Sequence, residues 1–189
     1  MPASRFLKLF IVLVASIVTG CTVVDRVKSD FSLIDAHKAY HAEDYTTASN
    51  HLLKGAELGS GEAAYLLSDL YLTGKGVKKD VPTGVKWMRE ASERNYLPAD
   101  VSIGLWTIGG LKGIKKNPVE GAERILKAAQ AGESEAMMTM GSLYMKGAGV
   151  TRSAEQALHW FQKAEKAGVA VDPGLLTIQG IEKNMRIRR

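Results

Sequence analysis

The sequence predicts an all-α protein, a right-handed α-solenoid of about four helical hairpins with a C-terminal capping helix. Three residue types support this fold class, because each recurs at intervals of 37 and then 36 residues. They are a loop glycine, a bulky helical residue and a small helical residue: Gly76, Gly113 and Gly149; Trp87, Arg124 and Trp160; Ala91, Ala128 and Ala164. Such a period is typical of stacked repeats, which bury apolar faces against neighbouring repeats and present long surfaces to partners. The pattern therefore favours binding over catalysis.

Residues 1–20 have the features of an export signal. Arg5 and Lys8 precede an apolar run from Leu9 to Val18, and small residues lead from there to Cys21. The run is too short to cross a bilayer comfortably, and its charged flank is typical of a signal peptide. An uncleaved N-terminal anchor and an ordinary secretory signal are the alternatives.

The segment Val18-Thr19-Gly20-Cys21 resembles the bacterial lipobox, with valine where leucine is commoner. The resemblance implies cleavage before Cys21 and acylation of its sulfur, as with palmitate. Cys21 is the only cysteine, so it can form no internal disulfide. Because Thr22 rather than aspartate follows, the resemblance favours a lipid anchor in the bacterial outer membrane, facing the periplasm. We expect residues 21–30 to form a tether of roughly 30 Å when extended.

The distribution of charge argues against a nucleic-acid partner. The chain has a formal net charge of +5, but residues 21–181 hold 19 basic and 19 acidic side chains. A nucleic-acid-binding domain would concentrate positive charge on its folded surface. Export would also separate this domain from the genome.

Residues 31–170 are expected to form the repeat domain, with its first helix from Phe31 and later units at about 62–97, 98–134 and 135–170. In each later unit a glycine ends the first helix and a favoured N-cap residue begins the second: Gly74 and Asp80, Gly110 and Asn117, Gly147 and Ser153. Glu120 and Gln156 stand where capping boxes place them. Ser68, Gly104 and Gly141 share one position in the first helices, where a small residue would let a neighbouring helix approach closely.

These positions together resemble the Sel1-like repeat family, which is tetratricopeptide-like. The last copy carries most of the family residues: Ala136, Met140, Gly141, Tyr144, Gly147, Gly149, Val150, Ala157, Trp160 and Ala164. Thr107 and Arg124 depart from the family tyrosine and tryptophan in the middle copy. The resemblance covers about residues 63–170 and implies an α-solenoid that contacts other proteins, often in bacterial envelopes. We therefore expect a non-enzymatic, lipid-anchored scaffold for one or more envelope proteins.

Residues 171–189 are expected to form a capping helix and a basic tail. Asp172 and Pro173 are a favourable helix start. Apolar residues that follow could cover the open end of the stack, which would otherwise meet water: Leu175, Leu176, Ile178, Ile181 and Met185.

Candidate partner-binding residues lie between the core positions of the first helices and would line a concave groove. They are Tyr65, Asp69, Leu72, Val101, Leu105, Ile108, Met138, Ser142 and Met145. Methionine and aromatic side chains are adaptable contact residues. The alternative is that these residues pack between neighbouring repeats.

Basic residues recur in the loops and would stack into one edge of the solenoid: Lys75, Lys78, Lys79, Lys112, Lys115, Lys116, Lys146 and Arg152. Such an edge could bind lipid headgroups or an acidic polysaccharide. A narrower expectation is thus an exopolysaccharide-secretion scaffold, because an alginate-export lipoprotein combines the same anchor and repeats. The alternative is that these loops are simply solvated.

His37 and His41 are the only hint of a metal-dependent enzyme. Four residues apart on a helix, they could share a face, but the sequence offers no third ligand at a telling distance. No Gly-x-Ser-x-Gly, Walker or His-Glu-x-x-His motif occurs. We therefore expect neither a metal nor another cofactor, and a metal-dependent hydrolase stays the rival hypothesis.

Overall fold

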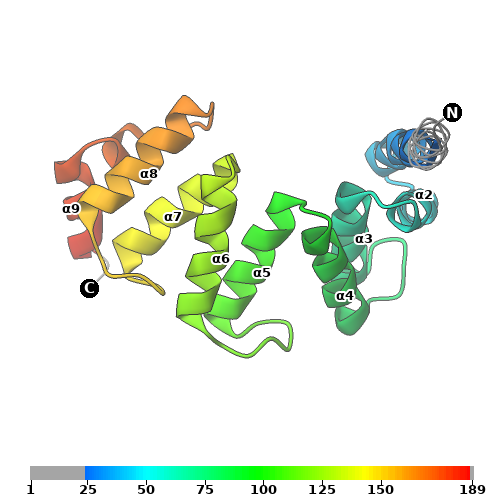
Figure 1. Cartoon of the computed structure of the whole chain (residues 1–189), viewed down its shortest axis with the longest axis horizontal. Helices are drawn as coiled ribbons and strands as arrows, with labels where there is room; N and C mark the ends of the chain where they lie inside the picture. Colours follow the sequence, from blue (N-terminus) through cyan, green and yellow to red (C-terminus); the bar gives the residue numbers. More distant parts are fainter. Residues whose placement is uncertain (1–23, 188–189) are drawn as a thin grey trace, which may run out of the picture. The chain divides into compact units, whose positions relative to one another are not determined.

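The structure is a computed structural model that describes residues 24–187, and all its regular elements are helices (Figure 1). Residues 24–41 form a first helix. It is followed by α2 Tyr45–Glu57, α3 Gly61–Thr73, α4 Val81–Glu93, α5 Leu97–Gly109, α6 Pro118–Gln130, α7 Ser134–Lys146, α8 Ala154–Lys166, the 3-10 turn η1 Pro173–Leu175 and α9 Ile178–Ile187. Across these residues no helix is both long and apolar enough to span a bilayer.

The repeat helices have one common length. Each of α2 to α8 contains 13 residues. The chain forms two compact units that divide within α4, between Trp87 and Met88. In the first unit α2 packs on α3; in the second, α5, α6, α7 and α8 pack successively and α9 covers α8. Stacked helical hairpins are the arrangement of an α-solenoid, which confirms the predicted fold class.

The predicted tether at 21–30 is wrong where the structure describes it, because residues 24–30 are already helical. This helix is held by small residues. Ser29 and Ser32 are buried, and the Ser29 hydroxyl donates to the carbonyl of Gly55 in α2 at 3.3 Å. A Cβ on Gly55 would lie 3.7 Å from the Cβ of Ser32, so the two helices approach closely.

The loops inside the hairpins follow the predicted pattern. Helices α3, α5 and α7 each end at a left-handed glycine, with φ of 82° at Gly74, 68° at Gly110 and 69° at Gly147. A residue with a side chain rarely adopts this conformation. Side chains of Asp80, Asn117 and Ser153 each accept from the amide three residues later, as N-caps do.

The capping boxes are incomplete, and this corrects the sequence interpretation. In a full box the N-cap amide donates to the side chain three residues on. Here the amides of Asp80, Asn117 and Ser153 donate instead to carbonyls of the preceding first helix, those of Tyr71, Thr107 and Tyr144, at 2.9, 2.8 and 3.1 Å. The same bond therefore closes all three loops onto the helix before them.

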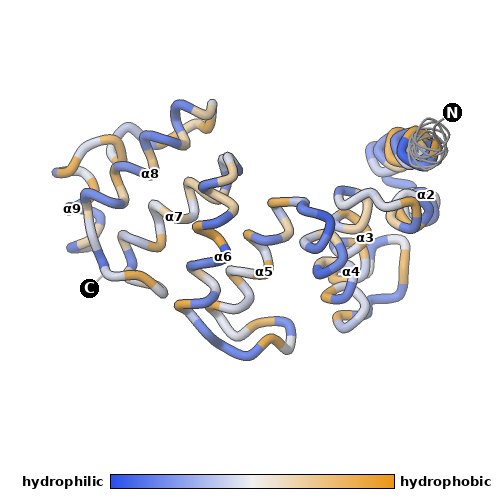
Figure 2. Tube along the Cα trace, in the orientation of Figure 1, coloured by the Kyte–Doolittle hydropathy of each residue, from blue (hydrophilic) through white to orange (hydrophobic). Residues whose placement is uncertain are grey.

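Small residues bring the two helices of a hairpin together, as predicted. A Cβ added to Gly104 would lie 2.5 Å from Cγ1 of Ile125, and one added to Gly141 would lie 2.5 Å from the ring of Phe161. Ser68 reaches the carbonyl of Gly84 with a 2.7 Å hydrogen bond. Figure 2 shows hydrophobic and hydrophilic residues alternating along the helices, as amphipathic helices require.

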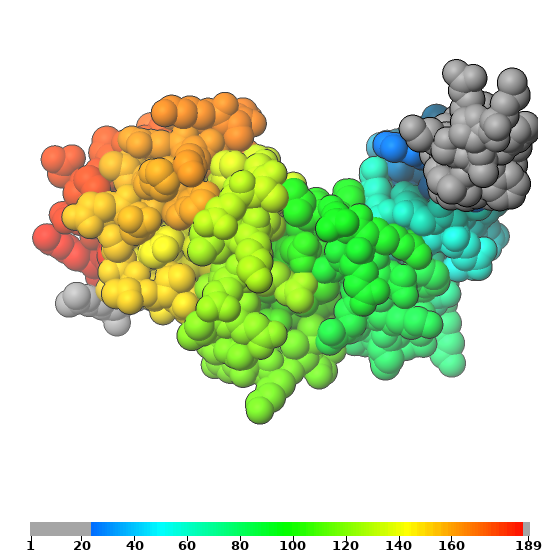
Figure 3. All heavy atoms as spheres, viewed as in Figure 1, coloured from blue at the N-terminus to red at the C-terminus, as the bar shows by residue number. Residues whose placement is uncertain are grey.

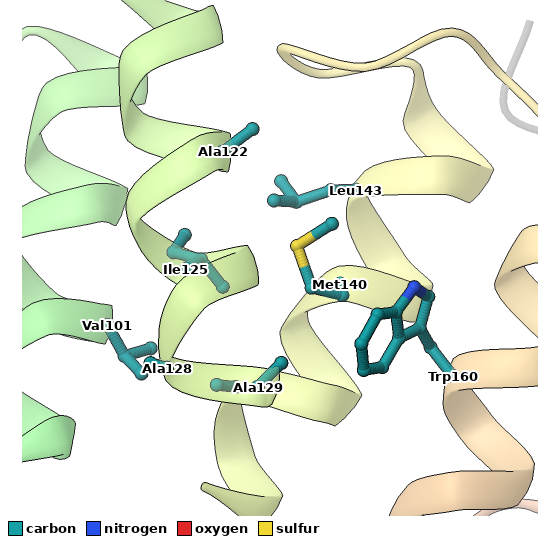
Figure 4. Close-up of a cluster of buried hydrophobic side chains, with 9 residues drawn as sticks. Val101, Ala122, Ile125, Ala128, Ala129, Met140, Leu143 and Trp160 are labelled. Carbon is teal, nitrogen blue, oxygen red and sulfur yellow. The ribbon is translucent and has the colours of Figure 1, made fainter. Parts of the chain in front are cut away.

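The core of the second unit lies between α6, α7 and α8. Met140 is fully buried between Ile125 of α6 and Trp160 of α8, with Leu143 beside it (Figure 4). A second cluster joins Phe161 and Met145 to Ile181 of α9. Ile181 is fully buried, so α9 caps the stack as predicted. Its start differs from the prediction: Pro173 opens only the short turn η1, and α9 begins at Ile178.

Candidate interaction surfaces

The predicted groove residues lie on the first helices, three each on α3, α5 and α7. Leu105 is 42% exposed. Six others are half-buried: Tyr65, Asp69, Leu72, Ile108, Met138 and Ser142. Within the second unit α5 contacts α7, and the residues of these helices that stay partly exposed are called the α5–α7 surface: Leu105, Ile108, Met138 and Ser142. Ile108 and Met138 also pack in part against the two core clusters of this unit. The three on α3 belong to the other unit, where Leu72 lies against Gly84 of α4.

Val101 and Met145 are not groove residues, which corrects two of the nine assignments. Val101 is 4% exposed and packs in the cluster that holds Ile125 and Met140. Met145 is 9% exposed and packs against Phe161 and Ile181. Val101 is buried by α6 and Met145 by α9. The residue pattern of one helix does not predict where these other helices lie.

The loop lysines are exposed, but they fall into separate groups. Lys75, Lys78 and Lys79 follow α3 in the first unit; Lys112, Lys115 and Lys116 lie on the α5–α6 loop of the second, and Lys146 ends α7. The α5–α6 loop projects at the edge of its unit (Figures 1 and 3). The Lys75 ammonium lies 5.2 Å from the centre of the Tyr45 ring, a cation–π contact.

Arg152 has a structural role rather than a place on the basic edge. Its Nε donates to the carbonyl of Met145 at 2.8 Å, and its Nη2 donates to the carbonyl of Met185 in α9. The guanidinium therefore ties the α7–α8 loop to the capping helix. Because these hydrogen bonds engage its guanidinium, Arg152 does not belong to the predicted basic edge.

Asp80 keeps a negative charge beside the lysines of the first unit. The side chain and the amide of Thr83 both donate to its carboxylate, at 2.7 and 3.2 Å. These hydrogen bonds hold the pKa of Asp80 below its ordinary value, and the charge of Lys78 lowers that pKa further.

A polar cluster occupies the position of the family tryptophan in the middle repeat. Arg124 pairs with Asp100, Nη1 to Oδ1, at 2.6 Å, and also donates to the Ser92 hydroxyl at 3.1 Å. Ser92 in turn donates to Asp100 at 2.8 Å. Sequence reasoning noted Arg124 but missed its partners. The sequence held a signal for this pair: Asp100 occupies the position that the apolar residues Ala64 and Met137 occupy in the neighbouring repeats.

The two histidines of the rival enzyme hypothesis have different surroundings. His37 Nε2 lies 3.3 Å from Glu62 Oε1 on α3, whereas His41 is exposed near the end of its helix. Within residues 24–187 no three His, Cys, Asp or Glu side chains are grouped as a metal site would need. Cys21, the predicted acylation site, lies outside the described residues.

Comparisons with known proteins show what the repeats are. The family described as "Sel1 repeat" matches residues 61–96 and 134–169. The middle repeat, with Arg124 in the tryptophan position, falls between the two matches. A crystal structure of a Sel1 repeat protein from Oxalobacter formigenes is 28% identical, with a TM-score of 0.60 over 65% of this chain and 49% of that one.

Other relatives are much longer than this chain. The protective antigen c5321 of uropathogenic Escherichia coli, which displays an SLR fold, is 27% identical with a TM-score of 0.61 over 79% of this chain and 31% of its own. The chitin synthase regulator SKT5 of Saccharomyces cerevisiae is 31% identical over 59% of this chain and 16% of its own. Chitin synthase regulatory factor 4 of Schizosaccharomyces pombe is 29% identical over 66% and 19%. Loop geometry, hairpin packing and these likenesses agree that the chain carries Sel1 repeats at residues 61–96 and 134–169, a class of repeat that typically mediates protein–protein interaction.

Proposed function

We propose that the protein is a non-enzymatic scaffold, anchored by lipid to the outer membrane of a bacterial envelope, that binds another envelope protein from the periplasmic side. The observation that carries this is the surface shared by α5 and α7. Leu105 is exposed there, and Ile108 and Met138 are half-buried on the same pair of helices. Apolar residues of this kind, held on rigid helices, suit protein contact.

The relatives support the binding part of the proposal. Two of them are named as regulators of chitin synthase rather than as enzymes. This chain spans about a sixth of their length, so their partner is not carried over. What the likeness supports is the class of activity, regulation through contact with another protein.

Changing the α5–α7 surface tests the proposed docking role. Leu105→Asp should reduce the envelope proteins that co-purify with the chain, because charge on an apolar contact disfavours its burial. Val119→Asp is the matched control, since Val119 is 57% exposed but lies on α6. Equal recovery of envelope proteins with the wild-type chain, the Leu105 variant and the Val119 variant would refute docking on this surface.

The anchor requires a separate test. Mass spectrometry of the processed protein should find acyl chains on Cys21, and Cys21→Ser should release the protein from outer-membrane fractions. An unmodified Cys21 would refute the anchor and leave the docking surface untouched.

Binding of an acidic polysaccharide is a second candidate, favoured by the exposure of Lys112, Lys115 and Lys116 on one projecting loop. Contacts between exposed charges weaken as salt rises. Retention on immobilised alginate should therefore fall with salt and be lost when Lys115 and Lys116 are changed to Ser. Retention that does not change with salt concentration would argue against this role.

A further inference from the structure

The first helix, residues 24–41, carries an apolar stripe that faces away from the fold. Val24, Val27, Phe31 and Ile34 are spaced by three, four and three residues, the spacing of one helix face. Phe31 is 66% exposed and Ile34 61%. The large apolar residues of a helix face normally pack into a core, so this stripe needs a separate explanation.

The opposite face of the same helix is already occupied. Ser29, Ser32, Ala36 and Ala39 are buried, and Ser29 is hydrogen-bonded to Gly55 of α2. The helix is thus fixed by its small residues while its large apolar residues face outward. Rotation about its axis to hide the stripe would break these contacts.

The stripe begins next to the predicted lipid. Only Thr22 and Val23 separate Cys21 from Val24, so the Cα atoms of 21 and 24 lie within about 10 Å in any conformation. From Val24 to Ile34 the helix rises roughly 15 Å. An acyl chain on Cys21 would therefore hold the whole stripe close to the bilayer surface.

We propose that residues 24–34 form an interfacial helix, with this stripe inserted among the headgroups and upper acyl chains of the membrane that anchors Cys21. The inference rests on the proposed lipid anchor. Amphipathic helices that lie in a membrane surface bury an apolar face of this kind. Residues 24–41 contain three basic and three acidic side chains, so the contact is apolar and should persist in high salt: Arg26, Lys28 and Lys38; Asp25, Asp30 and Asp35.

A fluorophore on a single new cysteine tests this directly, because acylation consumes Cys21, the only native thiol. The full-length processed protein is reconstituted into vesicles of phosphatidylethanolamine and phosphatidylglycerol. An environment-sensitive dye at Ile34→Cys should shift to the blue and lose its quenching by aqueous iodide. The same dye at Arg26→Cys, exposed on the same helix and nearer the lipid but off the stripe, should stay quenched.

A second substitution shows whether the stripe itself causes the protection. Phe31→Asp in the Ile34→Cys chain should restore iodide quenching, whereas Val119→Asp should leave it unchanged. Equal quenching at 26 and 34 would overturn the inference. Protection at 34 that is lost when protein is diluted at constant lipid would also overturn it, and would assign the stripe to a second copy of the chain.

The two proposals fail in different ways. If the mass of the unlabelled protein shows no acyl chains, the anchor fails and the interfacial helix fails with it. If Cys21 is acylated and the dye at 34 remains open to iodide, the anchor stands and only the interfacial helix is refuted.

Discussion

Arg124 forms an ion pair with Asp100 at the position where the next repeat has the buried Trp160. The replacement of the tryptophan involves at least three residues, because Ser92 is hydrogen-bonded to both Arg124 and Asp100. The middle repeat thus replaces apolar packing with a half-buried polar cluster. Asp100 keeps only 21% of its side chain exposed, and Arg124 is the cation that pairs with its carboxylate.

Arg124→Ala should destabilise the protein by about 1 kcal/mol, since it leaves a half-buried carboxylate without its cation. The partial exposure of Arg124 keeps the loss below that of a fully buried pair. Urea unfolding measures it, with exposed Glu123→Ala on the same helix as the control. Losses of equal size in the two variants would contradict a specific role for the pair.

Gly141→Ala should cost about 1–3 kcal/mol, because the new methyl would overlap the Phe161 ring. Part of that loss should return in the double variant Gly141→Ala with Phe161→Leu, where the smaller side chain makes room. Thermal unfolding of the two single variants and the double variant gives the coupling energy. If the losses of stability in the two single variants simply add in the double variant, the close approach of α7 and α8 does not limit the size of residue 141.

Gly113→Ala and Gly149→Ala form a matched pair. Both glycines have positive φ, 77° and 75°, so alanine at either should cost about 1 kcal/mol from the backbone alone. At Gly149 the added Cβ would also strike the carbonyl of Pro118, whereas at Gly113 it would meet open space. The Gly149 variant should therefore have the lower melting temperature; the reverse order would contradict the loop contact.

Asp80 should contribute to stability through its charge. Its folded pKa lies below the ordinary value of 3.8, so this contribution is present above pH 3.8 and is lost as the pH falls through the folded pKa. Asp80→Asn keeps an N-cap acceptor without a titrating group. The stability difference between wild type and Asp80→Asn should shrink in acid. A difference that stays constant from neutral pH to pH 2 would rule out this linkage.

Local chemistry made much of the fold predictable. A left-handed glycine such as Gly147 and an N-cap such as Ser153 act within a few residues, so the sequence pattern locates the hairpin loops directly. The prediction failed where burial depends on distant segments. Met145 is covered by α9, Arg152 reaches Met185, and Ser29 packs on Gly55. Residues 24–30 are a mixed, partly polar stretch typical of a tether, and their helix depends on the contact of Ser29 with Gly55, which lies 26 residues further along the chain.

Site-specific photocrosslinking in the native envelope tests the central claim, that the α5–α7 surface docks a protein partner. A photoreactive residue at Leu105 or Met138 should give one discrete protein adduct, the same from both positions. The same residue at Val119 on α6 should give none. Adducts that form equally from Val119, or from none of the three positions, would contradict the account.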